Sequence, residues 1–295
     1  MRDLAGRVAL VTGGAGGIGL GIARAFQSAG MRVAIADIDA PRLGATAAAH
    51  GMLAVMLDIT NAASWAAAVA QVEATLGPID LLCNNAGVMQ GRFGDGTPIH
   101  LAEMPETLFR TVVEINLTGS FLGVRTVVPG MIARGHGHIV NTASMAGLIA
   151  PGGLGAYAAS KYAVLGMTES LRAELAPKGI GVSVLCPGAV ESDLVATSAA
   201  RHAATRGESV PLEASRPVSY HRMTAQSVGT RVLQSVLQNE FYILTHPDYA
   251  PLFAERAAAV AASFGAPAEP GYTEPEMVLT RSRNPEYVRA ARQET

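Results

Sequence analysis

A tyrosine and a lysine stand four positions apart in the segment Tyr157-Ala158-Ala159-Ser160-Lys161. On a helix, side chains at this spacing lie on one face, so the ammonium group would lie close to the phenol. The pKa of a free phenol is about 10, and lowering it to about 7 takes roughly 4 kcal/mol, which nearby cations in a partly dry site can supply. The pair therefore predicts a general acid/base. A pair on a surface helix without chemistry is the alternative.

Two other polar residues could serve the same reaction. Ser144 lies thirteen residues before Tyr157 and just after an apolar run, and its hydroxyl could polarise a substrate carbonyl. Asn116 falls inside a long stretch with helical character, where asparagine is a mediocre helix former. An asparagine at such a position suggests a specific role.

A glycine-rich turn follows the first apolar run of the chain and precedes a helical stretch. Glycines at such a turn let backbone N–H groups approach a pyrophosphate, and the helix N-terminus adds a positive dipole. The turn fits two motifs, because Gly14, Gly16 and Gly19 form G-x-G-x-x-G while Gly13, Gly17 and Gly19 form T-G-x-x-x-G-x-G. The local sequence does not separate them, and a turn without a ligand is the alternative.

Asp37 ends the second apolar run, eighteen residues after Gly19. A carboxylate at this place suits the ribose hydroxyls of an adenosine and repels a 2′-phosphate, which favours NAD over NADP. Arg42 is the basic group close enough to keep NADP open, and a capping or turn role is the alternative for Asp37. Asp58 and the segment Asn84–Gly87 end the next two apolar runs, where they could equally be a helix cap and turn formers.

These residues must be positioned by alternating strands and helices. Short apolar runs alternate with alanine-rich helical stretches, which is typical of a parallel sheet covered on both faces. The strands are expected at 7–12, 32–37, 52–57, 80–84, 138–142, 181–186 and 241–245, and the helices at 17–29, 41–50, 62–76, 106–133, 157–176, 224–239 and 249–264. The fold class is therefore α/β, a single doubly wound domain with seven parallel strands and helices on both faces.

Two segments depart from this alternation. Residues 192–223 have no clear period, and a loop of this length in a compact domain is usually a lid or disordered. We expect a substrate-loop or lid insertion at 189–223. The chain after residue 265 contains several prolines. We therefore expect a Rossmann-type dinucleotide-binding and catalytic domain at 1–265 and an extended C-terminal tail at 266–295.

Taken together, the motifs resemble the short-chain dehydrogenase/reductase family, in its single-domain Rossmann branch. The matching elements are Thr12-Gly13-x-x-x-Gly17-x-Gly19, Asp58, Asn84-Asn85-Ala86-Gly87, Asn116, Ser144, Tyr157-x-x-x-Lys161 and Pro187-Gly188. Jointly they are specific, they cover residues 7 to about 192, and they select the T-G-x-x-x-G-x-G register.

The resemblance implies a catalytic role for each of four residues. Tyr157 is the general acid/base, Lys161 lowers its pKa and holds the nicotinamide ribose, and Ser144 orients the substrate oxygen. Asn116 sits at a helix irregularity and holds a water that links Lys161 to solvent.

The resemblance also implies cofactor contacts. Asp58 and Ile59 flank the adenine, and Asn85 lies along the cofactor. Ser192 stands where the family usually has a threonine that bonds the nicotinamide carboxamide. The cofactor-binding set is Gly13, Gly17, Ile18, Gly19, Asp37, Asp58, Ile59, Asn85, Ala86, Gly87, Tyr157, Lys161, Pro187, Gly188, Val190 and Ser192.

The implied reaction moves a hydride between NAD and a secondary alcohol or ketone. Met145 and Leu154 are weaker substrate candidates beside Ser144 and Tyr157, with ordinary packing as the alternative. The enzyme is then an alcohol dehydrogenase with ketoreductase activity in reverse; an NADP(H)-dependent ketoreductase and a catalytically silent dinucleotide-sensing regulator are the alternatives. Family members are commonly oligomers, which predicts a homodimer or homotetramer.

The composition excludes several other classes. A formal net charge of −2 with no basic patch argues against nucleic acid as a partner. Cys83 and Cys186 both end apolar runs and are expected to be buried free thiols, and no Cys/His cluster has metal-ligand spacing. We expect no metal, no membrane span and a cytoplasmic protein.

Overall fold

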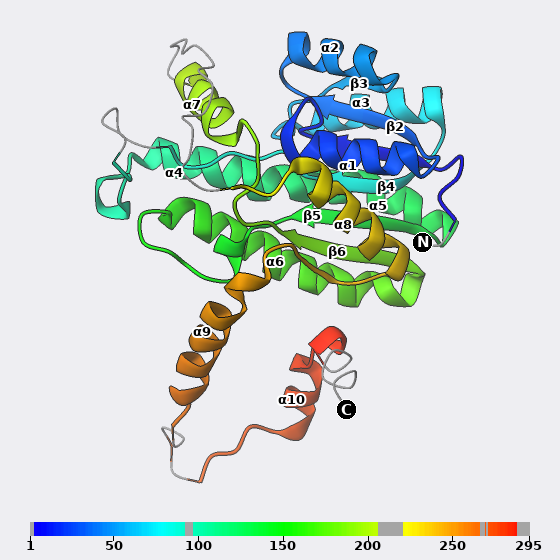
Figure 1. Ribbon diagram of the computed structural model, residues 1–295. Helices are drawn as coiled ribbons and strands as arrows, with labels where there is room; N and C mark the ends of the chain where they lie inside the picture. The colour runs from blue at the N-terminus through cyan, green and yellow to red at the C-terminus, as the bar shows by residue number, and fades with distance from the viewer. Residues whose placement is uncertain (1–2, 92–96, 206–220, 266–268, 270, 288–295) are drawn as a thin grey trace.

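A seven-stranded parallel sheet forms the centre of the computed structural model, in the order β3-β2-β1-β4-β5-β6-β7 (Figure 1). The structure describes residues 3–91, 97–205, 221–265, 269 and 271–287. The strands are β1 (Val8–Thr12), β2 (Arg32–Asp37), β3 (Leu53–Met56), β4 (Ile79–Asn84), β5 (Gly137–Thr142), β6 (Ile180–Cys186) and β7 (Tyr242–Leu244). The predicted α/β class with seven parallel strands is confirmed.

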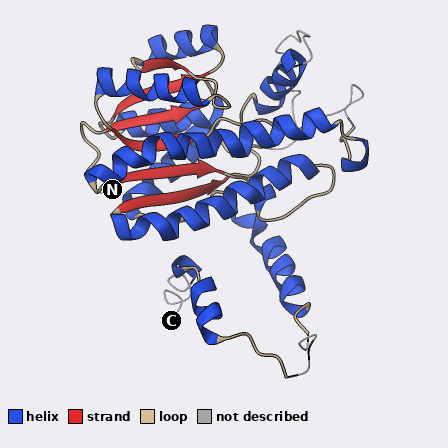
Figure 2. Cartoon of the chain, turned by 180° about the vertical axis from the view of Figure 1, so that it is seen from behind, coloured by secondary structure: helices blue, strands red, loops and turns tan. Residues whose placement is uncertain are grey.

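Helices cover both faces of this sheet (Figure 2). On one face α1 (Gly17–Ser28), α2 (Ala40–His50) and α8 (Ala225–Gln238) bury an apolar cluster that includes Phe26 and Ile35. On the other face α3 (Ala62–Leu76), α5 (Gly119–Arg134) and α6 (Gly155–Leu175) bury a second cluster around Trp65 and Met131. The strands are apolar on both sides because both sides are covered.

The strand order reverses between β1 and β4, which pair with each other while their crossovers leave in opposite directions. In a doubly wound sheet this reversal opens a crevice at the carboxyl ends of the strands, where ligands bind. The carboxyl ends of β1, β2 and β4 carry the glycine-rich turn, Asp37 and Asn85. The sheet topology therefore brings residues from distant parts of the sequence to one edge.

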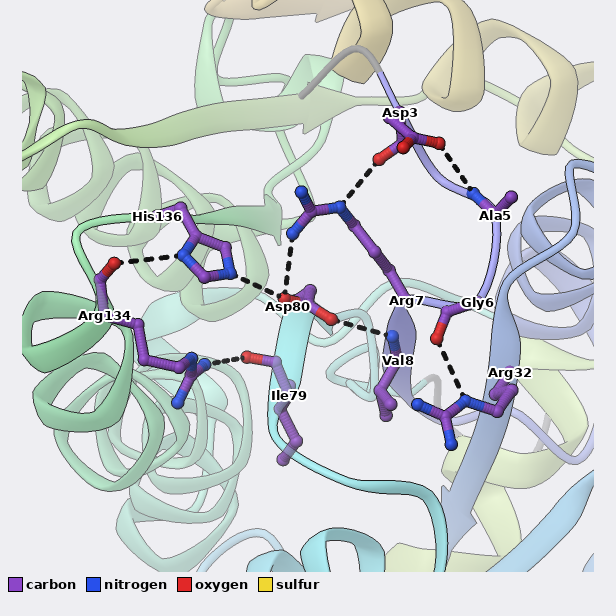
Figure 3. Close-up of polar contacts among 10 residues, drawn as sticks. All are labelled: Asp3, Ala5, Gly6, Arg7, Val8, Arg32, Ile79, Asp80, Arg134 and His136. Carbon is purple, nitrogen blue, oxygen red and sulfur yellow. Dashed lines mark hydrogen bonds and ion pairs between the residues drawn. The ribbon is translucent and has the colours of Figure 1, made fainter.

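The opposite edge of the sheet is closed by the Asp80 carboxylate at the start of β4 (Figure 3). This carboxylate accepts hydrogen bonds from the Val8 backbone N–H at 3.0 Å and from Arg7 Nη1 at 3.2 Å. Nε2 of His136 lies 3.1 Å from the same carboxylate. These contacts join the amino ends of β1, β4 and β5, which lie on the opposite side of the sheet from the glycine-rich turn.

The long helix expected over 106–133 is interrupted in the structure. It consists of α4 (Glu106–Val113), a π-helical turn (Glu114–Thr118) and α5. The wider turn contains Asn116, which is buried. A π-turn inserts one extra residue per turn and is frequent at functional sites.

The lid segment contains a helix that the sequence pattern did not predict, α7 (Leu194–Thr205). Residues 206–220, which make up much of the predicted lid, lie outside the described part of the chain. A parallel bridge between Val190 and Met223 holds the two ends of the lid together.

The C-terminal region differs from the expected extended tail. Helix α9 (Ala250–Ala262) leads away from the body, and a second helix, α10 (Glu276–Ser282), follows it. We call the described residues from 250 to 287 the C-terminal arm, which projects from the body in both views (Figures 1 and 2). The arm returns to α6, where Nε of buried Arg172 pairs with Oε1 of Glu286 at 2.9 Å. This long-range ion pair anchors the last described residues to α6, and a local sequence pattern does not reveal it.

Candidate active site

A cavity of about 1270 Å³ lies at the carboxyl edge of the sheet. It exceeds the size usual for a single small ligand and suits a dinucleotide together with a substrate. Nearly all residues proposed from the sequence line it: Gly13, Gly17, Ile18, Asp37, Asp58, Ile59, Asn85, Ala86, Gly87, Ser144, Met145, Leu154, Tyr157, Lys161, Pro187, Gly188, Val190 and Ser192. Gly19 and Asn116 do not line the cavity, and each lies behind its wall.

The glycine-rich turn has the form that a pyrophosphate requires. Gly13 has a φ of +64°, and a Cβ at Gly19 would overlap the carbonyl oxygen of Gly13, so both positions need glycine. Helix α1 begins at Gly17, and Gly16 before it has no side chain that could cap the helix. The first N–H groups of α1 are therefore available to an anion, and the turn fits a dinucleotide.

Asp37 is held at the end of β2 by three backbone N–H groups. Its Oδ2 accepts from Ala15 at 3.2 Å, and its Oδ1 accepts from Ile38 at 2.8 Å and from Asp39 at 3.2 Å. The bond to Ala15 ties the carboxylate directly to the glycine-rich turn. This location fits a partner for the ribose hydroxyls.

The alternative reading of Asp58 as a helix cap is wrong, because Asn61 caps α3 by accepting from the Ser64 N–H. Oδ1 of Asp58 instead accepts hydrogen bonds from the backbone and side chain of Thr60. The Asp58 carboxylate therefore lines the cavity and is not needed to cap α3.

The segment after β4 is fixed to the glycine-rich turn. The Thr12 hydroxyl accepts hydrogen bonds from the N–H groups of Asn85 and Ala86, both at 3.0 Å, and Nδ2 of Asn85 donates to the Thr12 carbonyl at 3.1 Å. The two loops therefore form one rigid floor for the cavity.

Tyr157 lies in the first turns of α6, with 8% of its surface exposed. Burial raises the pKa of its hydroxyl above the ordinary value, while a hydrogen bond with Ser144 lowers it in part. The protein chain alone therefore does not produce the lowered pKa that the sequence predicts. Desolvation outweighs the neighbouring dipole, so a general base at this position needs further positive charge.

Lys161 lies one turn along α6 and points to the same cavity. Its Nζ donates to the Thr142 carbonyl at 2.9 Å and lies 5.6 Å from the centre of the Tyr157 ring. Burial lowers the pKa of the ammonium to about 8. The predicted juxtaposition of a phenol and an ammonium group is thus present.

Asn116 binds the backbone of the loop after β4, at Val88. Its side-chain oxygen accepts from the Val88 N–H at 2.8 Å, while its amide donates to the Val88 carbonyl at 2.9 Å and to Ser160 Oγ at 3.0 Å. A Cβ on Gly87 would lie 2.9 Å from this oxygen and 3.4 Å from Nζ of Lys161. Asn116 therefore fixes the loop that passes beside Lys161; the water that the resemblance assigns to it stays a prediction.

Gln90 is a positioning residue behind the cavity wall that the sequence reading missed. It is fully buried, and its amide donates to the carbonyls of Ile99 and Gly153, both at 2.9 Å. Its side-chain oxygen accepts from the Tyr157 N–H at 3.1 Å. It thereby joins two loops to the start of α6, and no motif in the sequence singles it out.

The roof of the cavity comes from α7, which the sequence reading also missed. Oγ of Ser198 accepts from the Met89 N–H at 2.9 Å, and Nε2 of His202 lies 2.6 Å from the Met89 carbonyl. Arg201 lies 3.8 Å from the Asp58 carboxylate. The helix therefore spans the cavity from the loop after β4 to the carboxyl end of β3, where Asp58 lies.

A family model described as short chain dehydrogenase matches residues 7–203. The chain belongs to the short-chain dehydrogenase/reductase family. It is 34% identical over 285 residues to a CLA biosynthesis dehydrogenase/reductase of Lactiplantibacillus plantarum, covering 90% of this chain and 97% of that protein. It is 36% identical over 248 residues to the 1-deoxy-11-beta-hydroxypentalenate dehydrogenase of Streptomyces exfoliatus, covering 82% and 84% of the two chains.

A solved structure extends this similarity to three dimensions. A short-chain dehydrogenase/reductase of Burkholderia phymatum in complex with NAD superposes with a TM-score of 0.77 at 30% identity, covering 92% of this chain and all of the other. Because the chain belongs to this family, it is an oxidoreductase, and the family uses a nicotinamide cofactor.

The structure also bears on metals, membranes and thiols. Within the described residues, no group of three or more His, Cys, Asp or Glu side chains could hold a metal ion. None of the helices in that part of the chain has the length and apolar character to cross a membrane. Cys83 and Cys186 are free and buried, as predicted.

Proposed function

We propose that this protein is an NAD-dependent oxidoreductase that interconverts a secondary alcohol and a ketone, with Tyr157 as the general acid/base. The observation that supports this most directly is the convergence of Tyr157, Ser144 and Lys161 in the same cavity as the glycine-rich turn and Asp37. The three side chains supply a proton acceptor, a hydroxyl that orients the substrate oxygen, and a buried cation.

The chain's own residues divide the work of the reaction. A nicotinamide cofactor, when bound, supplies the hydride acceptor for oxidation or the hydride donor for reduction. The Tyr157 oxygen takes the proton of the substrate hydroxyl during oxidation and returns it during reduction. The Ser144 hydroxyl orients the substrate oxygen, and the Lys161 ammonium favours the phenolate form of Tyr157.

The substrate end of the cavity is mostly apolar. Met89, Met145, Ile149 and Leu154 line it beside Tyr157. Apolar walls with few polar groups suit a carbon skeleton that presents a single hydroxyl or carbonyl to the acid/base. We therefore propose a small-molecule secondary alcohol or ketone with an apolar body as the substrate.

Removing the Tyr157 hydroxyl tests the proposed reaction. Tyr157→Phe should lower the rate of NAD reduction, followed at 340 nm with a panel of secondary alcohols, by at least about a hundredfold, because it removes the proton acceptor. Ser144→Ala should lower the rate as well, since the substrate oxygen loses its hydrogen bond.

Binding of NAD, followed by calorimetry, is the control for both variants. It should persist, because the glycine-rich turn and Asp37 are intact. An undiminished rate in Tyr157→Phe would refute the assignment, and binding without any oxidation in the wild-type protein would favour the sensing regulator instead.

One observation favours a second candidate, an NADP(H)-dependent ketoreductase. Arg42 lines the cavity beside Asp37, and an arginine there could attract a 2′-phosphate. The contacts of this arginine bear on the choice between the two cofactors.

A further inference from the structure

The guanidinium group of Arg42 lies directly on the glycine-rich turn. Its Nε donates to the Ala15 carbonyl at 3.1 Å, and a Cβ at Gly16 would overlap the guanidinium. The absence of a side chain at Gly16 therefore makes room for a cation that comes from α2. Asp37 binds the N–H of the same Ala15, so the carboxylate and the guanidinium flank one residue of the turn.

The lid holds the other end of this guanidinium. Nη2 of Arg42 lies 2.6 Å from Oδ2 of Asp193, the residue before α7, and both residues line the cavity. The two side chains are 30% and 52% exposed, so the pair lies at the rim of the cavity rather than in the core. The contact joins the lid to the adenosine end of the site across 151 residues of sequence.

The charges at this end of the cavity therefore do not favour a phosphate. The Asp37 carboxylate and the Arg42 guanidinium both bind Ala15, and Asp193 pairs directly with the guanidinium and neutralises the charge that Arg42 could offer. A 2′-phosphate would have to displace Asp193 from Arg42 while it is repelled by both carboxylates. A 2′-hydroxyl is uncharged, so it is not repelled by the carboxylates and can bind while Asp193 stays paired with Arg42.

We propose that Asp193 is a specificity-determining residue, which holds Arg42 in an ion pair and thereby makes the adenosine pocket select NAD over NADP. This inference rests on the proposed function, because it requires that the cavity binds a dinucleotide. It assigns cofactor choice to a residue of the lid as well as to Asp37 at the end of β2.

Titration of the full-length protein with NAD and with NADP, by calorimetry, tests the proposal. In the wild-type protein NAD should bind more tightly. In Asp193→Asn the ratio of the two dissociation constants should shift toward NADP by roughly three- to fivefold, a modest effect because exposed ion pairs are weak. Glu191→Gln is the matched control, since it removes one negative charge from an exposed side chain of the same loop that does not line the cavity.

The double variant Asp193→Asn/Arg42→Ala identifies the route of the effect. If Asp193 acts mainly by holding Arg42, most of the gain in NADP binding should disappear in the double variant. A ratio within twofold of wild type in Asp193→Asn would overturn the proposal. So would an equal shift in Glu191→Gln, or a gain that is undiminished in the double variant.

Failure of the proposed function has a different signature. If the wild-type protein binds neither dinucleotide, the proposed function fails and this inference fails with it. If the wild-type protein binds NADP more tightly, the proposed NAD dependence is wrong and so is the role of Asp193 in producing it.

Discussion

At the scale of single residues, the proposed active site contains a buried lysine, Lys161. Lys161 is almost fully buried and donates to a backbone carbonyl, and burial lowers its pKa to about 8 from 10.5 in the unfolded chain. Below pH 8 the folded protein therefore carries a buried ammonium that the unfolded chain would keep in water. This burial costs stability, and in the mechanism we propose the same charge supports the phenolate form of Tyr157.

Replacing Lys161 by an uncharged residue should remove the free-energy cost of burying its ammonium group. Below pH 8 both states are protonated and the cost is full, roughly 3 kcal/mol at 1.36 kcal/mol per pKa unit. Between pH 8 and 10.5 the unfolded chain binds more protons, so wild-type stability rises with pH as the cost disappears. Lys161→Met should be more stable than wild type at pH 7 by about 1–3 kcal/mol, and the difference should shrink toward pH 10.

Urea unfolding at pH 7 and pH 10 measures the difference. Lys178→Met is the control, because it removes a lysine that is exposed and lies outside the cavity. A Lys161→Met protein that is less stable than wild type by the same amount at both pH values would contradict the argument. The variant should also lose most of its oxidation rate, since Tyr157 loses its neighbouring cation.

At the scale of elements, α1 carries the glycine-rich turn and is fixed against α8 by unusually close packing. A Cβ at Gly229 in α8 would overlap the Gly21 carbonyl in α1, and a Cβ at Gly21 would overlap the Ala225 carbonyl. The two helices therefore approach until their backbones touch. This contact sets the direction in which the N-terminus of α1 meets the cavity.

Adding one methyl group at this contact should destabilise the protein. Gly229→Ala forces two backbones apart and should lower the free energy of unfolding by about 1–3 kcal/mol or more. Gly44→Ala in α2 is the matched control, because nothing lies within 4 Å of the added Cβ and alanine favours a helix. That variant should be stabilised by about 0.5–1 kcal/mol. Denaturation curves compare them, and equal effects would show that the helices can separate freely.

At the scale of the whole molecule, the C-terminal arm is joined to the body at both ends. Near its start, the Arg256 guanidinium lies over the Tyr162 ring of α6 at 5.2 Å, and several residues of α9 line the mouth of the cavity. At its end, Glu286 pairs with Arg172, and the Tyr287 hydroxyl donates to Glu169 at 2.7 Å. The arm is thus tied to the helix that carries Tyr157 and Lys161.

The buried pair at the end of the arm should matter for stability. Glu286→Ala leaves the guanidinium of Arg172 buried without this counter-ion and should cost about 3 kcal/mol. Glu276→Ala is the control, since Glu276 is exposed and lies 4.0 Å from Arg283, so it should cost under about 0.5 kcal/mol. Thermal unfolding measures both. Similar small effects in the two variants would mean that the arm is not anchored through Arg172.

The exposed arm also bears on the expected homodimer or homotetramer. All thirteen residues of α9 are exposed, although Leu252, Phe253 and Val260 are among them. Apolar surface of this kind on a helix favours association. We predict a solution mass of two or four times 30.4 kDa, which light scattering after size-exclusion chromatography measures. A single monomeric peak at micromolar concentration would contradict it.

Local sequence determined the strands, most of the helices and the residues around the cavity, because periodic burial and short motifs depend on neighbours along the chain. Glycine at 13, 17 and 19, the Tyr157 and Lys161 pair, and Ser144 were all readable in this way. Only the tertiary structure showed α7, Gln90, the π-helical form of the irregularity that the resemblance implied at Asn116, and the ion pairs of Arg42 with Asp193 and Arg172 with Glu286. Those contacts join residues far apart in sequence, so they exist only once the sheet has brought its loops together. The direction of the Tyr157 pKa likewise depends on burial, which three-dimensional packing decides.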